Sequence, residues 1–501
     1  MWYTRKGIKG SNPFVSARIS NNAPTGVFLF ILLKKCGRSV CNLRLPGSGR
    51  QKKLATNRKY YIIRHNCSKD FSMSSLHYVA GIDFGTTNSA VSVSDGGEPH
   101  MIQIGHSSTT IPSALFFDES TRCVFMGHDA YNKYREPFSE GRFMRSLKRI
   151  LGTPIMSTGT QIYGKNTKFE DIIAYFIRHL KEKLDTSVNQ SVTDVVMGRP
   201  VHFRDNDSSG DDAAQNQLEH IAHKVGFKNV AFQYEPIAAA FAHERKLTSE
   251  HLALVVDIGG GTSDFTVIRL GANLMNKPDR TDDILANTGV RIGGNDFDHA
   301  FAIDKFMPEY GLGSMYRSGD KILPVPNAPY IDLATWSAVN RVYTASVWNL
   351  MRGVQIGAQE PDKISRMMDI LQNNLGHTNL DYIEMEKIQL SSQDIIKQRF
   401  EFLSDCPEFT TRVSEFINAI KNNVEKIVVA MNACLSQASI RNTDIDLIIL
   451  TGGSTQIPYV YNIFKSMFPR AVISDSNKMD SVGLGLAYDA MRRFAEPQHT
   501  K

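Results

Sequence analysis

The chain has 501 residues, 42% of them hydrophobic and 22% charged, which is the composition of a globular protein with roughly two to four compact units. Its net charge of +6 is uneven, because residues 1–77 contain 15 Lys and Arg but one acid, Asp70, leaving 42 basic and 50 acidic side chains elsewhere. The resulting charge of −8 on the body argues against nucleic acid as a partner, since such binding needs clustered basic side chains. No apolar run is long enough to span a membrane.

The basic N-terminal extension, residues 1–77, has three interpretations: an organelle transit peptide, a disordered arm, or an upstream stretch that is not translated, with Met73 as the true start. Met73 lies a few residues before the first predicted strand, where a compact domain would begin. A transit peptide predicts the mitochondrial matrix as the location of the protein, whereas a start at Met73 predicts the cytoplasm.

A first lobe is expected over residues 78–250. It opens with a strand over 78–83, a tight turn over 84–87 and a returning strand over 89–94 in which apolar and polar residues alternate. Strands and helices then alternate, which predicts an α/β sheet covered by helices. These elements are a helix over 168–187, a strand over 192–198, a helix over 213–225, a strand over 229–234 and a helix over 236–244.

A second lobe, expected over residues 251–495, repeats that opening. Its elements are a strand over 252–257, a Gly-rich turn over 258–262, a strand over 265–270, a helix of about 25 residues from 413, a strand over 446–450 and a turn over 451–454. Residues 299–383 carry the weakest pattern and are interpreted as an insertion. Helices over 333–353 and 362–374 are predicted there, after a Pro-rich loop over 324–329.

The two openings carry similar turns, IDFGTTNS at 82–89 and DIGGGTSD at 257–264. A Gly-rich hairpin tip brings backbone N–H groups together without obstructing side chains, which suits the oxygens of a phosphate chain. The Asp before each turn suits a hydrated Mg²⁺ that separates it from the phosphates. A third turn, TGGSTQIP at 451–458, ends a strand and precedes a helix, so it predicts a site for a nucleoside or an α-phosphate.

The three turns, in this order, resemble the phosphate-1, phosphate-2 and adenosine motifs of the actin, hexokinase and heat-shock ATPase superfamily. Within it, residues 78 to about 493 are most similar to the nucleotide-binding domain of the DnaK (70-kDa heat-shock) chaperones. The resemblance implies an α/β actin-like ATPase fold, in which two duplicated ribonuclease-H-like lobes surround a nucleotide cleft, with ATP or ADP and Mg²⁺ as cofactors. Local strings that carry it are 109–113, 148–152, 234–240, 293–298 and 452–458.

The resemblance also implies roles for individual residues. Lys148 would be the catalytic lysine beside the γ-phosphate. The catalytic carboxylates would be Asp83, Asp257, Glu235 and Asp264, of which the first three would hold the metal, largely through waters. The remaining nucleotide-binding residues would be Gly85, Thr86, Thr87, Asn88, Gly259, Gly260, Gly261, Thr262, Glu384, Lys387, Ser391, Gly452, Gly453, Ser454 and Asp480.

The chain departs from the family pattern at two positions near the base. Ile388 and Gln456 replace arginines, which puts the affinity or selectivity for adenine in doubt. Pro200 matches the switch proline of the family, and Arg199 is unusual before it. No acidic-leucine linker and no peptide-binding domain are expected in the chain, so it is most similar to the stand-alone, shortened DnaK-like proteins described as chaperones.

The leading hypothesis is therefore a Mg²⁺-dependent ATPase whose nucleotide state switches its binding to an unknown protein client or co-chaperone. Two alternatives stay open: a non-catalytic nucleotide-binding adaptor, and a sugar or small-molecule kinase of the same superfamily.

Overall fold

The computed structural model describes residues 76–494 except 106–107, 137–139, 276, 278 and 475–479. Nearer the N-terminus it describes only the backbone of two antiparallel strand pairs, so the interpretations of the basic extension lie outside the described residues. The chain divides into two units, Met1–Leu76 and His77–Lys501, and the second is described below by itself. The short N-terminal strands are β1 (Ala17–Ile19), which pairs with β2 (Phe30–Leu32), and β3 (Cys41–Leu43), which pairs with β4 (Lys52–Leu54).

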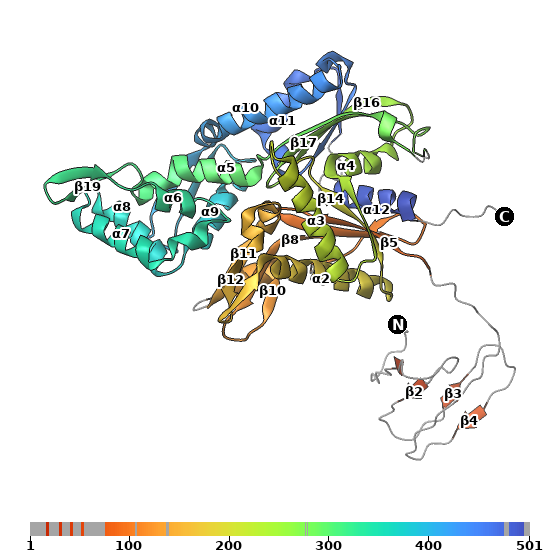
Figure 1. Ribbon diagram of the computed structural model, residues 1–501, viewed down its shortest axis with the longest axis horizontal. Coiled ribbons are helices and arrows are strands. Elements are labelled where there is room, and N and C mark those ends of the chain that lie inside the picture. Colours follow the sequence, from red (N-terminus) through yellow and green to blue (C-terminus); the bar gives the residue numbers. More distant parts are fainter. Residues whose placement is uncertain are drawn as a thin grey trace. The chain divides into compact units, whose positions relative to one another are not determined.

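The first sheet has the order β15-β14-β5-β6-β7 (Figure 1). Strands β5 and β6 form the predicted antiparallel hairpin, β14 joins β5 in parallel and β15 joins β14 in parallel, while the short β8 also pairs with β6. The strands are β5 (Val79–Phe84), β6 (Asn88–Ser94), β7 (His100–Met101), β8 (Thr110–Pro112), β14 (Asp194–Arg199) and β15 (Asn229–Tyr234).

The second sheet has the order β18-β17-β16-β23-β24, and its pairings repeat those of the first. In both, an antiparallel hairpin is followed on one side by an antiparallel strand and on the other by two parallel strands. This identity of topology confirms the predicted α/β class with duplicated lobes. The strands are β16 (His251–Ile258), β17 (Ser263–Leu270), β18 (Ile284–Val290), β23 (Leu447–Thr451) and β24 (Val472–Ser474).

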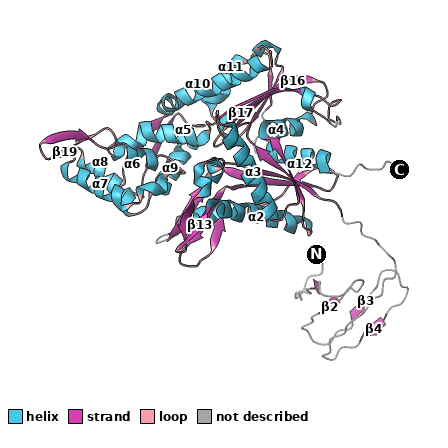
Figure 2. Ribbon diagram, viewed as in Figure 1, coloured by secondary structure: helices cyan, strands magenta, loops and turns pink. Residues whose placement is uncertain are grey.

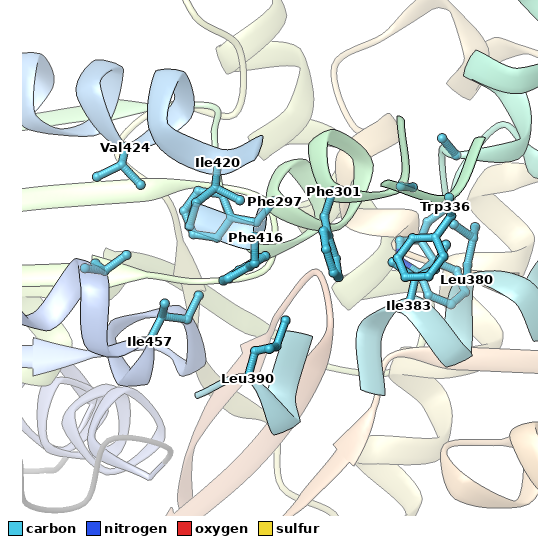
Figure 3. Packing of buried hydrophobic residues seen from close by; sticks show 14 of the residues in the cluster. Phe297, Phe301, Trp336, Leu380, Ile383, Leu390, Phe416, Ile420, Val424 and Ile457 are labelled. Carbon is cyan, nitrogen blue, oxygen red and sulfur yellow. The ribbon is translucent and has the colours of Figure 1, made fainter. Parts of the chain in front are cut away.

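Helices cover the outer face of each sheet (Figure 2). Helix α2 (Phe169–Val188) and helix α3 (Ser208–Lys224) bury their apolar stripes in the core of the first lobe. Helix α3 begins five residues before the predicted position because the carboxylate of Asp207 accepts a hydrogen bond from the Gly210 N–H at 2.9 Å. The second sheet is covered by α10 (Val413–Gln437) and α11 (Pro458–Met467), and α5 (Gly294–Phe301) packs against α10. The buried face of α10 includes Phe416 and Ile420 (Figure 3).

Two further helices, α4 (Glu235–Glu244) and α12 (Ser481–Phe494), lie between the sheets. Helix α4 packs on the second sheet, and α12, which the sequence assigns to the second lobe, packs on β5 and β14 of the first. Close approach requires glycine at their crossing, because a Cβ on Gly485 would lie 1.6 Å from the Ala238 carbonyl oxygen. Each lobe therefore receives a helix from the other half of the chain, which joins them at the base of the cleft.

Each lobe also carries a smaller subdomain. In the first lobe it contains β9 (Ala114–Asp118), β10 (Val124–Met126), α1 (His128–Tyr134), β11 (Gly141–Arg145), β12 (Gly159–Ile162) and β13 (Lys165–Lys168). In the second it contains β19 (Met315–Ser318), β20 (Lys321–Pro324), α6 (Ala328–Leu333), α7 (Ala345–Gly357), α8 (Pro361–Gln372), α9 (Gly376–Gln389), β21 (Ile395–Arg399) and β22 (Glu408–Arg412).

The predicted single helix over 333–353 is wrong. Helix α6 ends at Leu333, a 3₁₀ turn follows over Val339–Val342, and α7 begins after Thr344, whose side chain accepts from the Val347 N–H at 3.3 Å. The apolar period continues across the break because both helices and the turn pack on one core, so periodicity alone could not reveal it. The helix predicted over 362–374 is confirmed as α8. None of the described helices combines the length and apolarity needed to cross a membrane.

Candidate functional site

The turns of the two hairpins meet at a cavity of about 570 Å³ between the sheets. The first turn contributes Thr86 and Thr87, and the second contributes Gly260 and Gly261. A Cβ on Gly260 would lie 1.9 Å from Thr87 Oγ1, and one on Gly261 would lie 2.6 Å from Thr86 Oγ1. The tips are therefore in contact, and only residues without a Cβ permit this approach.

The second hairpin is oriented by the start of α5. The carbonyl oxygens of Gly259 and Gly260 accept hydrogen bonds from the N–H groups of Gly294 (2.9 Å) and Asn295 (2.8 Å). Because a trans peptide places its N–H opposite its C=O, the N–H groups of Gly260 and Gly261 point away from α5. Such oriented N–H groups at a glycine turn form an anion-binding concavity.

The third Gly-rich turn lies against the second hairpin. Gly452 has a φ of +79°, and a Cβ there would lie 2.3 Å from the Ile258 carbonyl oxygen. The Ser454 hydroxyl donates to the Gly259 carbonyl oxygen at 3.2 Å. The turn leads through a short 3₁₀ helix, Gly453–Gln456, into α11, so three segments far apart in the sequence line one cavity.

Helix α9 supplies another wall with Glu384, Lys387 and Ile388, and Ser391 of the turn that follows the helix extends it. Glu384 accepts hydrogen bonds from Arg145 of the first lobe at 2.8 and 3.4 Å. Burial alone would raise the pKa of Glu384, but Arg145 and Lys387 lower it to about 2. This carboxylate therefore stays ionised at neutral pH and can accept hydrogen bonds from hydroxyl groups.

Carboxyl groups that act on one another gather elsewhere in the cavity lining. Asp83 and Asp257 end the first strand of each hairpin, and Glu235 begins α4. Asp264 is buried behind them, where its Oδ1 accepts from the Val201 N–H at 2.8 Å. Lys148, in the 3₁₀ turn Leu147–Ile150, is buried and ion-paired with Glu235.

The carboxyl groups repel one another. Burial and the charge of Glu235 raise the pKa of Asp83 and of Asp264 to about 7, and the same causes raise the pKa of Asp257. Burial lowers the pKa of Lys148, but the surrounding carboxylates outweigh burial and raise it overall. One lysine therefore faces four acids, an excess of negative charge that favours a bound cation.

The donor set fits Mg²⁺, because hard carboxylate oxygens suit this ion and a phosphate chain would complete its shell. Within the part of the chain that the structure describes, no three His, Cys, Asp or Glu side chains are arranged to ligate one metal ion. That the carboxylates hold a hydrated Mg²⁺ through water stays a prediction.

Of the predicted residues, all except Asp264 and Asp480 line the cavity. Asp480, immediately before α12, accepts a hydrogen bond from the Thr109 hydroxyl at 2.8 Å instead. Thr110, Gly294, Asn295, Ser392 and Val482 also line the cavity and were not predicted. The string 293–298 already marked Gly294 and Asn295, whereas Val482 carries no local signal and reaches the site through the packing of α12 on the first sheet.

Comparison with known proteins shows which family the chain resembles. A family model described as Hsp70 protein matches residues 79–314 and 360–492, most of the chain. The chaperone protein DnaK of Mycoplasmopsis agalactiae (strain NCTC 10123 / CIP 59.7 / PG2) is 27% identical over 414 residues, which are 82% of this chain and 58% of the DnaK chain. The chain thus spans less than two thirds of the length of this relative. Residues 315–359, between the matched segments, lie inside the predicted insertion.

Proposed function

This chain belongs to the Hsp70 family, and from that membership we propose that it binds ATP and ADP in the cavity between the lobes and hydrolyses ATP there with Mg²⁺. The observation that carries the proposal is the contact between Thr86 and Thr87 of one lobe and Gly260 and Gly261 of the other. Two such tips bind a phosphate chain from both sides, and the adjoining carboxyl groups provide for its cation.

Each charged residue has a defined part in the proposed reaction. Asp83 and Asp257 would hold the waters of a bound Mg²⁺, and this ion would neutralise charge on the phosphates. Lys148 places a second positive charge beside the phosphate that is transferred, and Glu235 holds the ammonium group of Lys148 in position. Glu235, which lines the cavity, orders the attacking water, and the charge of Asp264 acts from behind the cavity wall, so the barrier falls mainly through positioning and electrostatics.

The site is also connected to the chain segment around Pro200, through which a change of bound nucleotide would be transmitted. Asp264 belongs to the second lobe, and the Val201 N–H that it binds follows Pro200 and Arg199 in the first. A change in the separation of the lobes would therefore act directly on the backbone at Pro200. We infer that the nucleotide state controls binding of a protein client or co-chaperone, as expected of a relative of a chaperone.

Titration calorimetry of the full chain with ATP, ADP and GTP in the presence of Mg²⁺, followed by phosphate release on the same sample, tests the proposal. Adenine-selective binding and slow hydrolysis are expected. Lys148→Ala should reduce hydrolysis by about 100-fold, as the loss of one charge aimed at the transition state does elsewhere. The matched control is Lys183→Ala, an exposed lysine on α2. Absence of nucleotide binding by the folded wild type would refute the proposal.

One observation favours a second candidate, the non-catalytic adaptor. Ile388 and Gln456 line the cavity where the family pattern has arginines, so a base would lack these cationic contacts. Nucleotide binding without phosphate release, in wild type and Lys148→Ala alike, would support the adaptor. Appearance of a phosphorylated sugar in the same assay would instead support a kinase.

A further inference from the structure

Residues 315–359, which the Hsp70 family model does not match, contain Trp336 between α6 and the following 3₁₀ turn. The indole is 4% exposed and packs in the same hydrophobic cluster as Leu380 and Ile383 of α9, beside which it is seen in Figure 3. Its Nε1–H donates to Asp298 Oδ2 at 3.4 Å. The segment therefore reaches the back of the helix that forms one wall of the cavity.

The face of Trp336 covers a cation from the other lobe. The guanidinium carbon of Arg145, the last residue of β11, lies 3.7 Å from the centroid of the indole ring. The Arg145 side chain is 2% exposed, and its two terminal nitrogens donate to both carboxylate oxygens of Glu384. The guanidinium of Arg145 is therefore shielded from water, stacked on the indole and bound to Glu384 by two hydrogen bonds, which together hold it in one geometry.

Aromatic and charged contacts extend this junction between the lobes. Tyr134 and Phe143 of the first lobe lie 5.4 and 5.0 Å from the ring of His377 in α9. Burial and the charge of Arg145 lower the pKa of His377 to about 3, so the ring is neutral and packs as an apolar group. Arg135 of the first lobe pairs with Asp381 at 2.8 Å.

Trp336 thus contacts the partners of both charged side chains that α9 presents to the cavity. Arg145 holds Glu384, and Asp298 pairs with Lys387 at 2.6 Å. We propose that Trp336 is a positioning residue that orients Glu384 and Lys387 and ties the lobes together, so that segment 315–359 acts as a brace that slows nucleotide release. This inference rests on the proposed function, because it assigns the nucleotide to the same cavity.

The test is the release of a fluorescent ADP analogue from the full chain, chased with unlabelled ATP in a stopped-flow instrument. Trp336→Leu should release the analogue about 30-fold faster, the factor expected for loss of a desolvated cation–π contact. Trp336→Phe, which keeps an aromatic face, should restore release to within about threefold of wild type. Trp348→Leu, in α7 of the same segment, is the matched control and should release at the wild-type rate.

Two readouts separate positioning from general damage. Single-turnover hydrolysis by Trp336→Leu should change by less than about twofold, because Trp336 contacts Arg145 and Asp298, whereas Lys148 is paired with Glu235. The double variant Trp336→Leu/Arg145→Met should release the analogue no faster than the faster single variant, since both changes remove one linked contact. Additive effects, or a parallel loss of hydrolysis, would overturn the inference.

The remaining outcomes are also decisive. Wild-type chain that fails to bind the analogue would refute both the proposed function and the brace. Wild-type binding with unchanged release from a folded Trp336→Leu protein would refute the brace alone. If Trp336→Leu does not fold, Arg145→Lys is tested instead, because lysine keeps the positive charge but cannot donate the paired hydrogen bonds to Glu384. Unchanged release of the analogue from Arg145→Lys would equally refute the inference.

Discussion

Substitution of Gly260 by Ala tests whether the two hairpin tips must touch for the site to work. The new Cβ would lie 1.9 Å from Thr87 Oγ1, 3.0 Å from Thr87 Cβ and 3.5 Å from the Thr87 backbone nitrogen. Rotation of the Thr87 side chain relieves the first contact but leaves the second, so the tips must separate by a few tenths of an ångström or more. Overpacking of this kind costs about 1–3 kcal/mol.

The cost falls on the arrangement in which the lobes are closed, because the clash joins the two lobes and not two parts of one core. Gly260→Ala should therefore weaken Mg²⁺–ATP binding by about 5- to 150-fold, the equivalent of that free energy. The melting temperature of the nucleotide-free protein should change little, because separation of the two tips relieves the clash without disturbing the core of either lobe.

Calorimetric titration with ATP gives the affinity, and thermal melting of the same preparation gives the stability. Gly353→Ala is the matched control, because a Cβ at this position in α7 meets nothing within 4 Å. Its affinity should equal that of the wild type, and its helix should gain about 0.5–1 kcal/mol. Wild-type affinity in Gly260→Ala would refute the reasoning that the tips close on the ligand.

Three further predictions concern the charges, the base and the chain start. Burial and the charge of Glu235 raise the pKa of Asp83 and Asp264 from 3.8 to about 7 in the folded protein. A carboxyl group whose pKa is higher in the folded protein contributes stability that is fully present below its unfolded pKa. That contribution is lost as the pH rises through its folded pKa. Thermal melting in EDTA should therefore show stability falling between about pH 4 and 7, Asp83→Asn should flatten the profile, and a wild-type profile that rises over this range would contradict it. Ile388→Arg places a cation at a position that is 61% exposed and lines the cavity, so the ATP affinity measured by calorimetry should rise by about 2- to 30-fold. The control is Ile356→Arg, at an 87% exposed position on α7, which should leave the ATP affinity unchanged. Intact-mass measurement of the native protein should give a chain that begins near Met73 if the upstream stretch is not translated; a mass for the whole of residues 1–501 would contradict this interpretation.

The hairpins and the phosphate-binding turns could be predicted because their determinants are local. The turn glycines, the threonines beside them and the preceding aspartates lie within eight-residue strings, and alternation identifies the strands on either side. The repeat of one pattern 175 residues later also predicted the duplicated sheet, since the same string in the same strand context folds in the same way.

Only the tertiary structure decided which segments meet across the lobes. The apolar stripe of α12 is compatible with either sheet, and its place on the first depends on Gly81, where a Cβ would lie 2.6 Å from the Ala487 nitrogen. Trp336 has the sequence signature of an ordinary core residue, yet its indole covers Arg145, which lies 191 positions earlier and pairs with Glu384. Local spacing determines the turn that binds a phosphate, whereas the packing of distant side chains determines how firmly the lobes are held around it.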